Sequence, residues 1–305
     1  MESTRIKIDI DDINQKNSVN VYKLISRGED AYIEQVREIA NQVSIFGKKI
    51  VLITGPSSAG KTTSSFKLKQ ELNALGISSH VLNMDDFFRP LKDVPLKEDG
   101  TPDIEGVGAV DVECIKNCLN DILTTGKTKT PTFDFATHSR TKYWNDCILA
   151  KNGVVIMEGI HALNPIVTEG IDPEKIYKVY VHCNTDFVFK GKTLFHARQL
   201  RFLRRLVRDE RERSCTYEKT ISTWDEVCAG EDKNIRPFKN TANYHLNSTH
   251  FYEPLLYKNM LLHEFDKRKD NETIKLFLER FKKCSTVDKE FVPKDSLIRE
   301  FIGEE

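Results

Sequence analysis

The stretch that decides the fold is KKIVLITGPSSAGKTT, residues 48–63. It opens with a continuous apolar run, which is typical of a strand buried on both faces of a parallel sheet. Residues 55–62 then complete the pattern G-x-x-x-x-G-K-T, and a helix is expected from about Lys61 to Leu75, where Gly76 can end it. A strand, a glycine-rich turn and a helix in this order predict a phosphate-binding loop.

The predicted loop has the chemistry of a nucleoside triphosphate site. Its glycines allow backbone N–H groups to surround phosphate oxygens, and the start of the helix adds a positive field. Lys61 is expected to reach the β- and γ-phosphates, and the Thr62 hydroxyl is expected to bind Mg²⁺. The residues expected to hold the nucleotide are Gly55, Pro56, Ser57, Ser58, Ala59, Gly60, Lys61, Thr62 and Thr63.

Outward from this loop, further apolar runs at 80–84, 154–159 and 176–183 alternate with helical segments. This alternation predicts an α/β fold, a P-loop NTPase-type parallel sheet with flanking helices. Residues 129–153 are interpreted as a β-hairpin laid over the substrate side of the sheet. Beyond residue 195 the chain is expected to be helical, as a lid and a C-terminus, with one strand near 242–246.

Three regions are expected along the chain. Residues 1–47 form an N-terminal extension with a strand at 5–10 and a helix at 29–43. Residues 48–265 form the nucleotide-binding core with its lid, and residues 266–305 form a C-terminal helical extension of the same domain. No linker divides the core.

Composition excludes several classes of protein. The 305 residues are 39% hydrophobic and 30% charged, as in a globular chain. The sequence has no run of eighteen apolar residues for a membrane span and no apolar N-terminal segment for a secretory signal. Lys+Arg and Asp+Glu both number 46, which argues against a nucleic-acid-binding surface at the level of the whole chain. Seven cysteines without a C-x-x-C pair are expected to be reduced packing thiols in the cytoplasm.

Among phosphate-loop proteins, small-molecule kinases fit the acidic residues best. No NKxD tetrapeptide for guanine recognition occurs, and Met157-Glu158-Gly159 stands where motor-type ATPases carry a pair of aspartates. A kinase needs a carboxylate at the acceptor hydroxyl, and Asp85 and Asp86 end the run at 80–84, where ligands collect in such sheets. A solvated strand end is the competing interpretation. Glu158 ends a buried run, and Mg²⁺ would explain an acid there.

A segment rich in arginine, residues 201–213, is predicted to be a lid helix. Its guanidinium groups suit phosphate oxygens and the charge that develops in phosphoryl transfer. A structural ion-pair helix and an RNA-contacting helix are the alternatives. A helical wheel places on one side Arg201, Arg204, Arg205, Arg208 and Arg211.

The predicted hairpin concentrates aromatic side chains, an imidazole and a guanidinium. Such groups suit stacking on a planar ring and hydrogen bonding to its edge. An aromatic pair in the core is the alternative. The residues concerned are Phe133, Phe135, His138 and Arg140.

In this order, the motifs GPSSAGKTT, MDDFFRP, PTFDFATHSR, VVIMEGIHAL and RFLRRLVRDERER resemble the uridine kinase–phosphoribulokinase family over about residues 45–260. The resemblance implies that ATP and Mg²⁺ are bound and that the 5′-hydroxyl of a nucleoside, uridine or cytidine, is phosphorylated. It implies that Asp85 is the base and that Glu158 lies near Mg²⁺. It matches Phe88, Phe133, Phe135, His138, Arg140 and Arg201 to the substrate site, and Arg204 and Arg208 to catalytic lid arginines beside Lys61. Phe88 and Phe133 replace family tyrosines.

One departure from the family concerns the acceptor. Family members carry a P-D-A-F-D stretch whose first aspartate holds the ribose hydroxyls, and Gly108 stands there in the stretch 107–111. A second hypothesis is therefore a kinase of another hydroxyl substrate, a sugar phosphate or a pantothenate-like acid. A third is a non-catalytic nucleotide-binding regulator, against which the intact loop and acidic residues argue. The expected partner is a small molecule, not nucleic acid or a membrane, and a homo-oligomer is left open.

Overall fold

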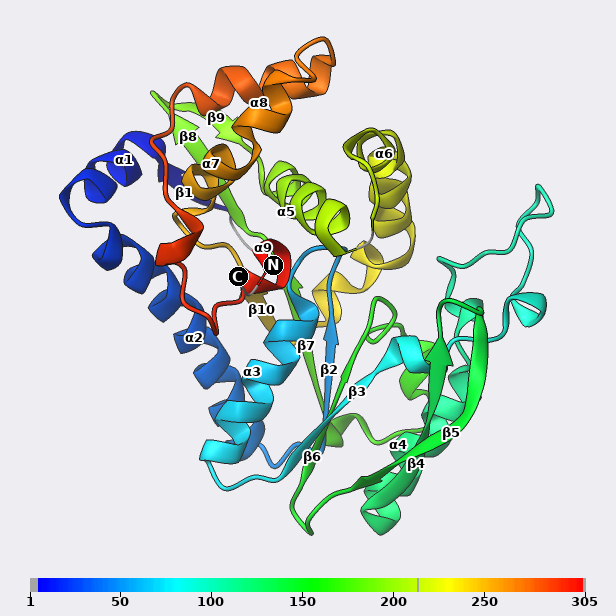
Figure 1. Cartoon of the computed structure of the whole chain (residues 1–305). Coiled ribbons are helices and arrows are strands. Elements are labelled where there is room, and N and C mark those ends of the chain that lie inside the picture. Colours follow the sequence, from blue (N-terminus) through cyan, green and yellow to red (C-terminus); the bar gives the residue numbers. More distant parts are fainter. Residues whose placement is uncertain (1–4, 213, 304–305) are drawn as a thin grey trace.

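A five-stranded, all-parallel sheet forms the centre of the computed structural model, which describes residues 5–212 and 214–303 (Figure 1). All four neighbouring pairs run parallel, as the continuous apolar runs predict. This is the predicted α/β fold. The strands in spatial order are β10 (Tyr244–Asn247), β7 (Ile176–His182), β2 (Ile50–Thr54), β6 (Val154–Glu158) and β3 (Ser79–Asn83).

Helices cover both faces of this sheet, and side chains alternate between the two layers. Val51 and Ile53 of β2 pack with α2 (Val21–Ile45) and α3 (Lys61–Ala74) on one face. Ile50 and Leu52 pack with α4 (Val112–Thr125) on the other face. Because successive strand residues point to opposite sides, every residue of β2 is buried.

The N-terminal segment shares the core of the sheet. Side chains of α2 belong to the same hydrophobic cluster as β2, and the Tyr32 hydroxyl lies 2.9 Å from the Ser64 hydroxyl of α3. The helix is longer than the predicted 29–43 because Asn20 caps it at Lys23 N–H, 2.9 Å away. The separation of residues 1–47 from the core stays a prediction.

A small second sheet was not predicted. It joins β1 (Ile6–Asp9), followed by α1 (Ile10–Val19), to β8 (Thr185–Phe189) and β9 (Lys192–Phe195). β1 pairs with β8 in parallel, with Ile6 opposite Thr185. The strand at 5–10 was expected, but nothing in its own sequence identifies a partner so far along the chain.

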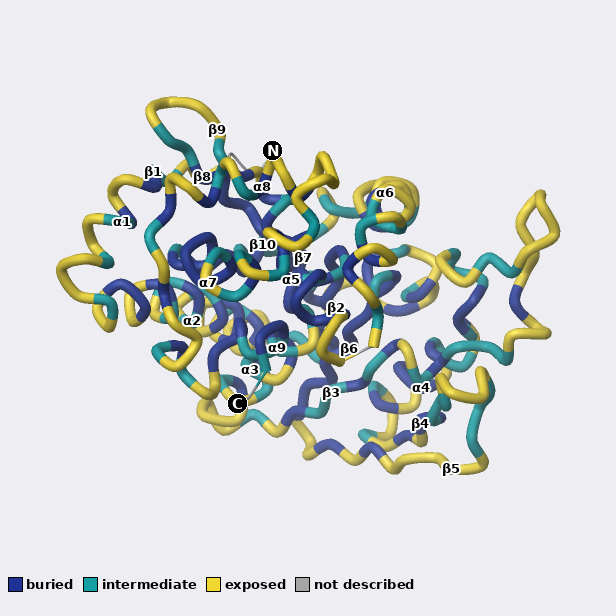
Figure 2. The backbone as a smooth tube through the Cα atoms, turned by 45° about the horizontal axis from the view of Figure 1, so that its top comes forward, coloured by how far each residue is buried: buried dark blue, intermediate teal, exposed yellow. Residues whose placement is uncertain are grey.

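The hairpin and the helical second half complete the chain. The hairpin consists of β4 (Lys127–Asp134) and β5 (Ser139–Ile148), paired antiparallel. Figure 2 shows buried backbone through β2, β7 and α5 and mostly exposed backbone along β5. No helix in the described part of the chain is long and apolar enough to cross a membrane. The later helices are α5 (Ala197–Glu212), α6 (Tyr217–Asn234), α7 (Glu253–Asp266), α8 (Glu272–Phe281) and α9 (Arg299–Ile302).

The end of β3 corrects one expectation. Asp85 and Asp86 do not end the strand: it stops at Asn83, and Met84–Phe87 form a 3-10 turn. The Asn83 side chain accepts a hydrogen bond from Asp85 N–H at 2.9 Å. An asparagine that bonds the backbone two residues on favours a turn over a continuing strand.

Candidate active site

The glycine-rich loop lies between β2 and α3, at the carboxyl end of the sheet. Gly60 is the N-cap of α3 and has a φ of +87°, a left-handed conformation, and a Cβ there would lie 2.7 Å from the Leu297 side chain. A Cβ at Gly55 would overlap the Val181 carbonyl oxygen. Both glycines are therefore required by backbone geometry, and the loop brings the first N–H groups of α3 to the sheet edge.

Thr62 and Glu158 meet beside this loop. The Thr62 hydroxyl donates to Glu158 Oε1 at 2.9 Å, and Glu158 is only 4% exposed. Burial raises the pKa of Glu158, and the opposing Lys61 charge and the Thr62 hydrogen bond lower it. Lys61 Nζ lies 3.4 Å from the Pro56 carbonyl oxygen, so the ammonium group remains at the loop.

These side chains fit a magnesium ion held together with phosphates. Within residues 5–212 and 214–303, no cluster of three or more metal-ligating side chains occurs. Mg²⁺ in phosphoryl-transfer sites needs only one or two protein oxygens, because phosphates and water supply the rest. The Thr62 hydroxyl and the buried Glu158 carboxylate provide such a pair.

Asp85 and Asp86 have different surroundings at the start of the turn. β3 adjoins β6 with Asn83 opposite Glu158, and the charge of the exposed Asp85 raises the pKa of Glu158. Burial raises the pKa of Asp86, and a hydrogen bond from the Phe133 backbone N–H opposes this. Asp85 therefore lies on the side of the loop, while Asp86 contacts the hairpin.

The arginines of α5 pack against the loop. Arg201 donates to the Ser57 carbonyl oxygen at 3.4 Å and to Glu231 at 2.5 Å. Arg205 Nη1 donates to the Ser57 hydroxyl at 3.0 Å. The helix buries residues on both of its faces, because Glu231 of α6 and Glu253 of α7 neutralise guanidinium groups on its arginine-rich side.

Arg204 and Arg208, the predicted lid arginines, are both buried. Arg204 is fully buried, pairs with Glu253 through two contacts of 2.7 Å, and donates to the Ser58 carbonyl oxygen at 3.2 Å. Arg208 donates to Asp209 at 2.6 Å. These contacts favour a structural role for Arg204 in shaping the loop, and a role of either arginine in transfer stays a prediction. Residue 213, also in the predicted lid, lies outside the described residues.

Three phenylalanines gather where the hairpin meets the turn. The Phe88 ring centroid lies 5.8 Å from Phe133 and 5.9 Å from Phe135, and the two hairpin rings are 5.0 Å apart. Phe135 is 54% exposed, so the cluster offers an aromatic surface to solvent. His138 is exposed at the hairpin turn with φ of 49°.

Arg140 is used to attach the hairpin to the turn. Its guanidinium donates to the Phe87 and Phe88 carbonyl oxygens, each at 3.2 Å, and pairs with Asp111 at 3.0 Å. At Gly108, a Cβ would lie 2.9 Å from the Pro95 ring. Close packing, and not a left-handed backbone, therefore explains why residue 108 is a glycine.

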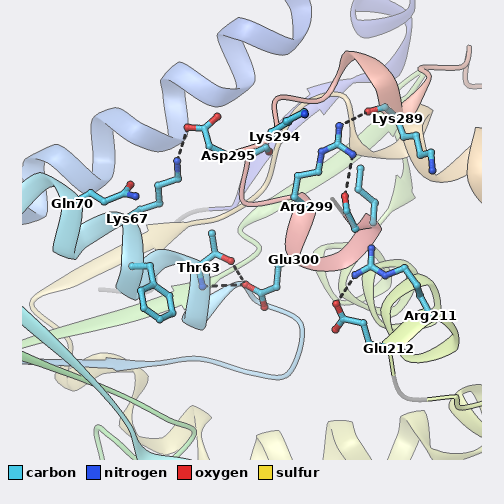
Figure 3. Close-up of a pocket in the computed structure, with 14 residues that line it drawn as sticks. Thr63, Lys67, Gln70, Arg211, Glu212, Lys289, Lys294, Asp295, Arg299 and Glu300 are labelled. Carbon is cyan, nitrogen blue, oxygen red and sulfur yellow. Dashed lines mark hydrogen bonds and ion pairs between the residues drawn. The ribbon is translucent and has the colours of Figure 1, made fainter. Parts of the chain in front are cut away.

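Sequence reasoning missed an acid from the far end of the chain. Thr63 donates to Glu300 Oε2 from its hydroxyl at 2.6 Å and from its backbone N–H at 3.2 Å (Figure 3). A cavity of about 730 Å³ opens beside this contact. No local pattern distinguishes Glu300 from other acidic residues, and only the packing of α9 on the loop reveals it.

Known proteins resemble this chain in sequence. The model of the "Phosphoribulokinase / Uridine kinase family" matches residues 50–250. A uridine kinase of Deinococcus deserti is 27% identical over 177 residues, covering 58% of this chain and 76% of that protein. One of Staphylococcus aureus is 29% identical over 196 residues, covering 64% and 84%.

Solved structures in the comparison include a possible uridine kinase from Bacillus stearothermophilus, 18% identical with a TM-score of 0.44 over 70% of this chain and 97% of that one. The phosphoribulokinase of Rhodobacter spheroides is 15% identical with a TM-score of 0.43, covering 65% of this chain and 68% of that one. The assignment rests on the family model, which covers more than half of the chain: the chain belongs to the phosphoribulokinase/uridine kinase family.

Proposed function

We propose that this protein transfers the γ-phosphoryl group of Mg²⁺·ATP to a hydroxyl of a small molecule, with the 5′-hydroxyl of uridine or cytidine as the leading acceptor. The observation that carries the proposal is the contact of Thr62 with buried Glu158 beside the loop, with Asp85 in the turn that follows the adjoining strand. The loop, the candidate metal ligands and the candidate base come from neighbouring strands at one edge of the sheet, which supports phosphoryl transfer.

The side chains around the phosphate loop have separate roles in phosphoryl transfer. Lys61 and the N–H groups of α3 bind and orient the phosphates. Mg²⁺, when held by Thr62 and Glu158, supplies charge that neutralises phosphate oxygens. Asp85, exposed toward the acceptor side, accepts the proton of the attacking hydroxyl. Positioning and charge stabilisation then account for most of the acceleration.

A nucleoside acceptor is supported by the aromatic cluster. Phe88, Phe133 and Phe135 present ring surface beside the turn that carries Asp85, and a planar base can stack on such rings. A different hydroxyl acceptor is supported by Gly108, where the family aspartate for the ribose is missing and the Pro95 ring fills the space. A sugar phosphate or hydroxy acid is therefore the second candidate.

The deciding experiment is a panel of acceptors with radiolabelled ATP. Uridine, cytidine, purine nucleosides, sugar phosphates and pantothenate are each incubated with the protein, and labelled product is measured. Lys61→Ala serves as the inactive control, because loss of the phosphate-facing cation should lower turnover about 100-fold or more. Product from none of these acceptors, with ATP bound, would contradict the proposal.

The hairpin then identifies the acceptor class. His138→Asn removes the imidazole but suits the left-handed backbone at that position, which asparagine tolerates. It should raise the KM for a nucleoside about 5- to 150-fold, from a lost hydrogen bond of about 1–3 kcal/mol, and leave the KM for ATP unchanged. An unchanged KM for the nucleoside would show that His138 does not bind the acceptor. His263→Asn, on the exposed surface of α7, is the matched control.

A further inference from the structure

The C-terminal segment, residues 289–303, lies against the start of α3 and is outside the stretch that the family model matches (Figure 3). Asp295 pairs with Lys67 at 2.8 Å, and the Ser296 hydroxyl donates to Glu29 at 2.7 Å. Leu297 is buried against Gly60. The segment is therefore held against α2 and α3 by polar contacts, and Leu297 adds an apolar contact with the phosphate loop.

The contact of Glu300 with Thr63 falls on a position where an anion binds. Thr63 N–H belongs to the first turn of α3, whose N–H groups have no partner within the helix. In a glycine-rich phosphate loop, such groups receive phosphate oxygens. Here both the N–H, at 3.2 Å, and the hydroxyl, at 2.6 Å, are taken by one oxygen of the Glu300 carboxylate.

The Glu300 carboxylate lies within hydrogen-bonding distance of both donors of Thr63. A phosphate placed on Thr63 would lie against this carboxylate, and two anions in contact repel each other strongly where water is scarce. Glu300 and a nucleotide phosphate cannot occupy Thr63 together.

We propose that Glu300 is a tethered competitor of the nucleotide: its carboxylate occupies a phosphate position of the loop and must leave before ATP binds fully. The inference rests on the proposed nucleotide function. Leu297 and Phe301 are buried and keep the segment attached to the fold, while the half-buried Glu300 side chain turns into the adjoining cavity and residues 298–303 lose their contact with Thr63. Lys289 and Lys294 also line that cavity and give it positive charge.

The test measures the Kd of Mg²⁺·ATP by titration calorimetry for the full chain and its variants. Suppose that the form with Glu300 bound to Thr63 is about ten times more populated than the form in which Glu300 has left. Glu300→Ala should then tighten ATP binding about tenfold. Glu300→Gln, which keeps an oxygen acceptor without charge, should fall between. Glu290→Gln is the matched control: it removes one acid from the same segment at an exposed position, and should leave the Kd unchanged.

Inorganic tripolyphosphate has no nucleobase or ribose, so it separates competition at the phosphate position from effects on binding of the nucleoside part of ATP. It should gain affinity from Glu300→Ala to a similar degree as ATP. Hydrogen exchange of the unmodified protein gives an independent measurement: a non-hydrolysable ATP analogue should increase exchange in residues 298–303, because the carboxylate no longer holds them on Thr63.

Two results would overturn the inference. Glu300→Ala could leave the ATP Kd within about twofold of the original or weaken it, which would make Glu300 a structural helix cap. Exchange in residues 298–303 could remain unchanged or fall on binding the analogue. Failure of the underlying function has a different outcome, because then neither the original protein nor Glu300→Ala would bind ATP or tripolyphosphate.

Discussion

Replacing Arg204 by methionine should destabilise the protein by about 3–5 kcal/mol, because breaking a buried ion pair leaves an uncompensated charge. Both Arg204 and Glu253 are fully buried. The guanidinium makes two contacts of 2.7 Å with Glu253, two bonds to Ser248 and one to the Ser58 carbonyl oxygen. Glu253 keeps one backbone N–H donor, from His250 at 2.7 Å, so the lower half of that range is expected.

The assay is urea unfolding followed by circular dichroism, with the free energy of unfolding compared at constant m. The double variant Arg204→Met/Glu253→Gln should recover at least half of the loss, since no unpaired charge then remains. A change below about 1 kcal/mol in Arg204→Met would refute the structural interpretation. If the stable double variant lost turnover while it still bound ATP, the result would indicate that Arg204 takes part in phosphoryl transfer.

The remaining predictions concern the turn, the acceptor loop and a buried histidine. Asp85→Asn should lower kcat by about 100-fold or more and leave the ATP Kd unchanged, whereas Asp86→Asn should have the smaller effect on kcat, which steady-state kinetics and calorimetry can compare. Gly108→Asp should cost about 1–3 kcal/mol of unfolding free energy, because its Cβ would meet the Pro95 ring; equal stability would disprove that overlap. Burial lowers the pKa of His182 from 6.5 to about 3, so between these pH values the imidazole is protonated in the unfolded chain and neutral in the folded protein. Stability is therefore complete above about pH 6.5 and falls as the pH drops toward 3, by about 2 kcal/mol at pH 5, and His182→Leu should abolish this part of the acid dependence in unfolding measurements.

Local sequence determined the centre of the fold and the identity of the loop. The run before Gly55 and the spacing to Lys61 predict a buried strand, a phosphate loop and a helix, because burial on both faces and left-handed turns depend on residues close in sequence. Glu158 and Asp85 were expected at the sheet edge for the same reason, since each follows a short apolar run. The exact end of β3 was not predicted, because the Asn83 side chain competes locally with strand pairing.

Tertiary structure alone decided the contacts that surround the loop. The helical wheel of an arginine-rich helix is the same whether its arginines face solvent or buried acidic residues. Only the packing of α7 against α5 therefore reveals that Arg204 pairs with Glu253. Likewise, Thr63 and Glu300 are 237 residues apart, and each is an ordinary polar residue in its own segment. Long-range ion pairs and hydrogen bonds form when packed elements bring side chains within about 3 Å, and the spacing of residues along one segment carries no information about that distance.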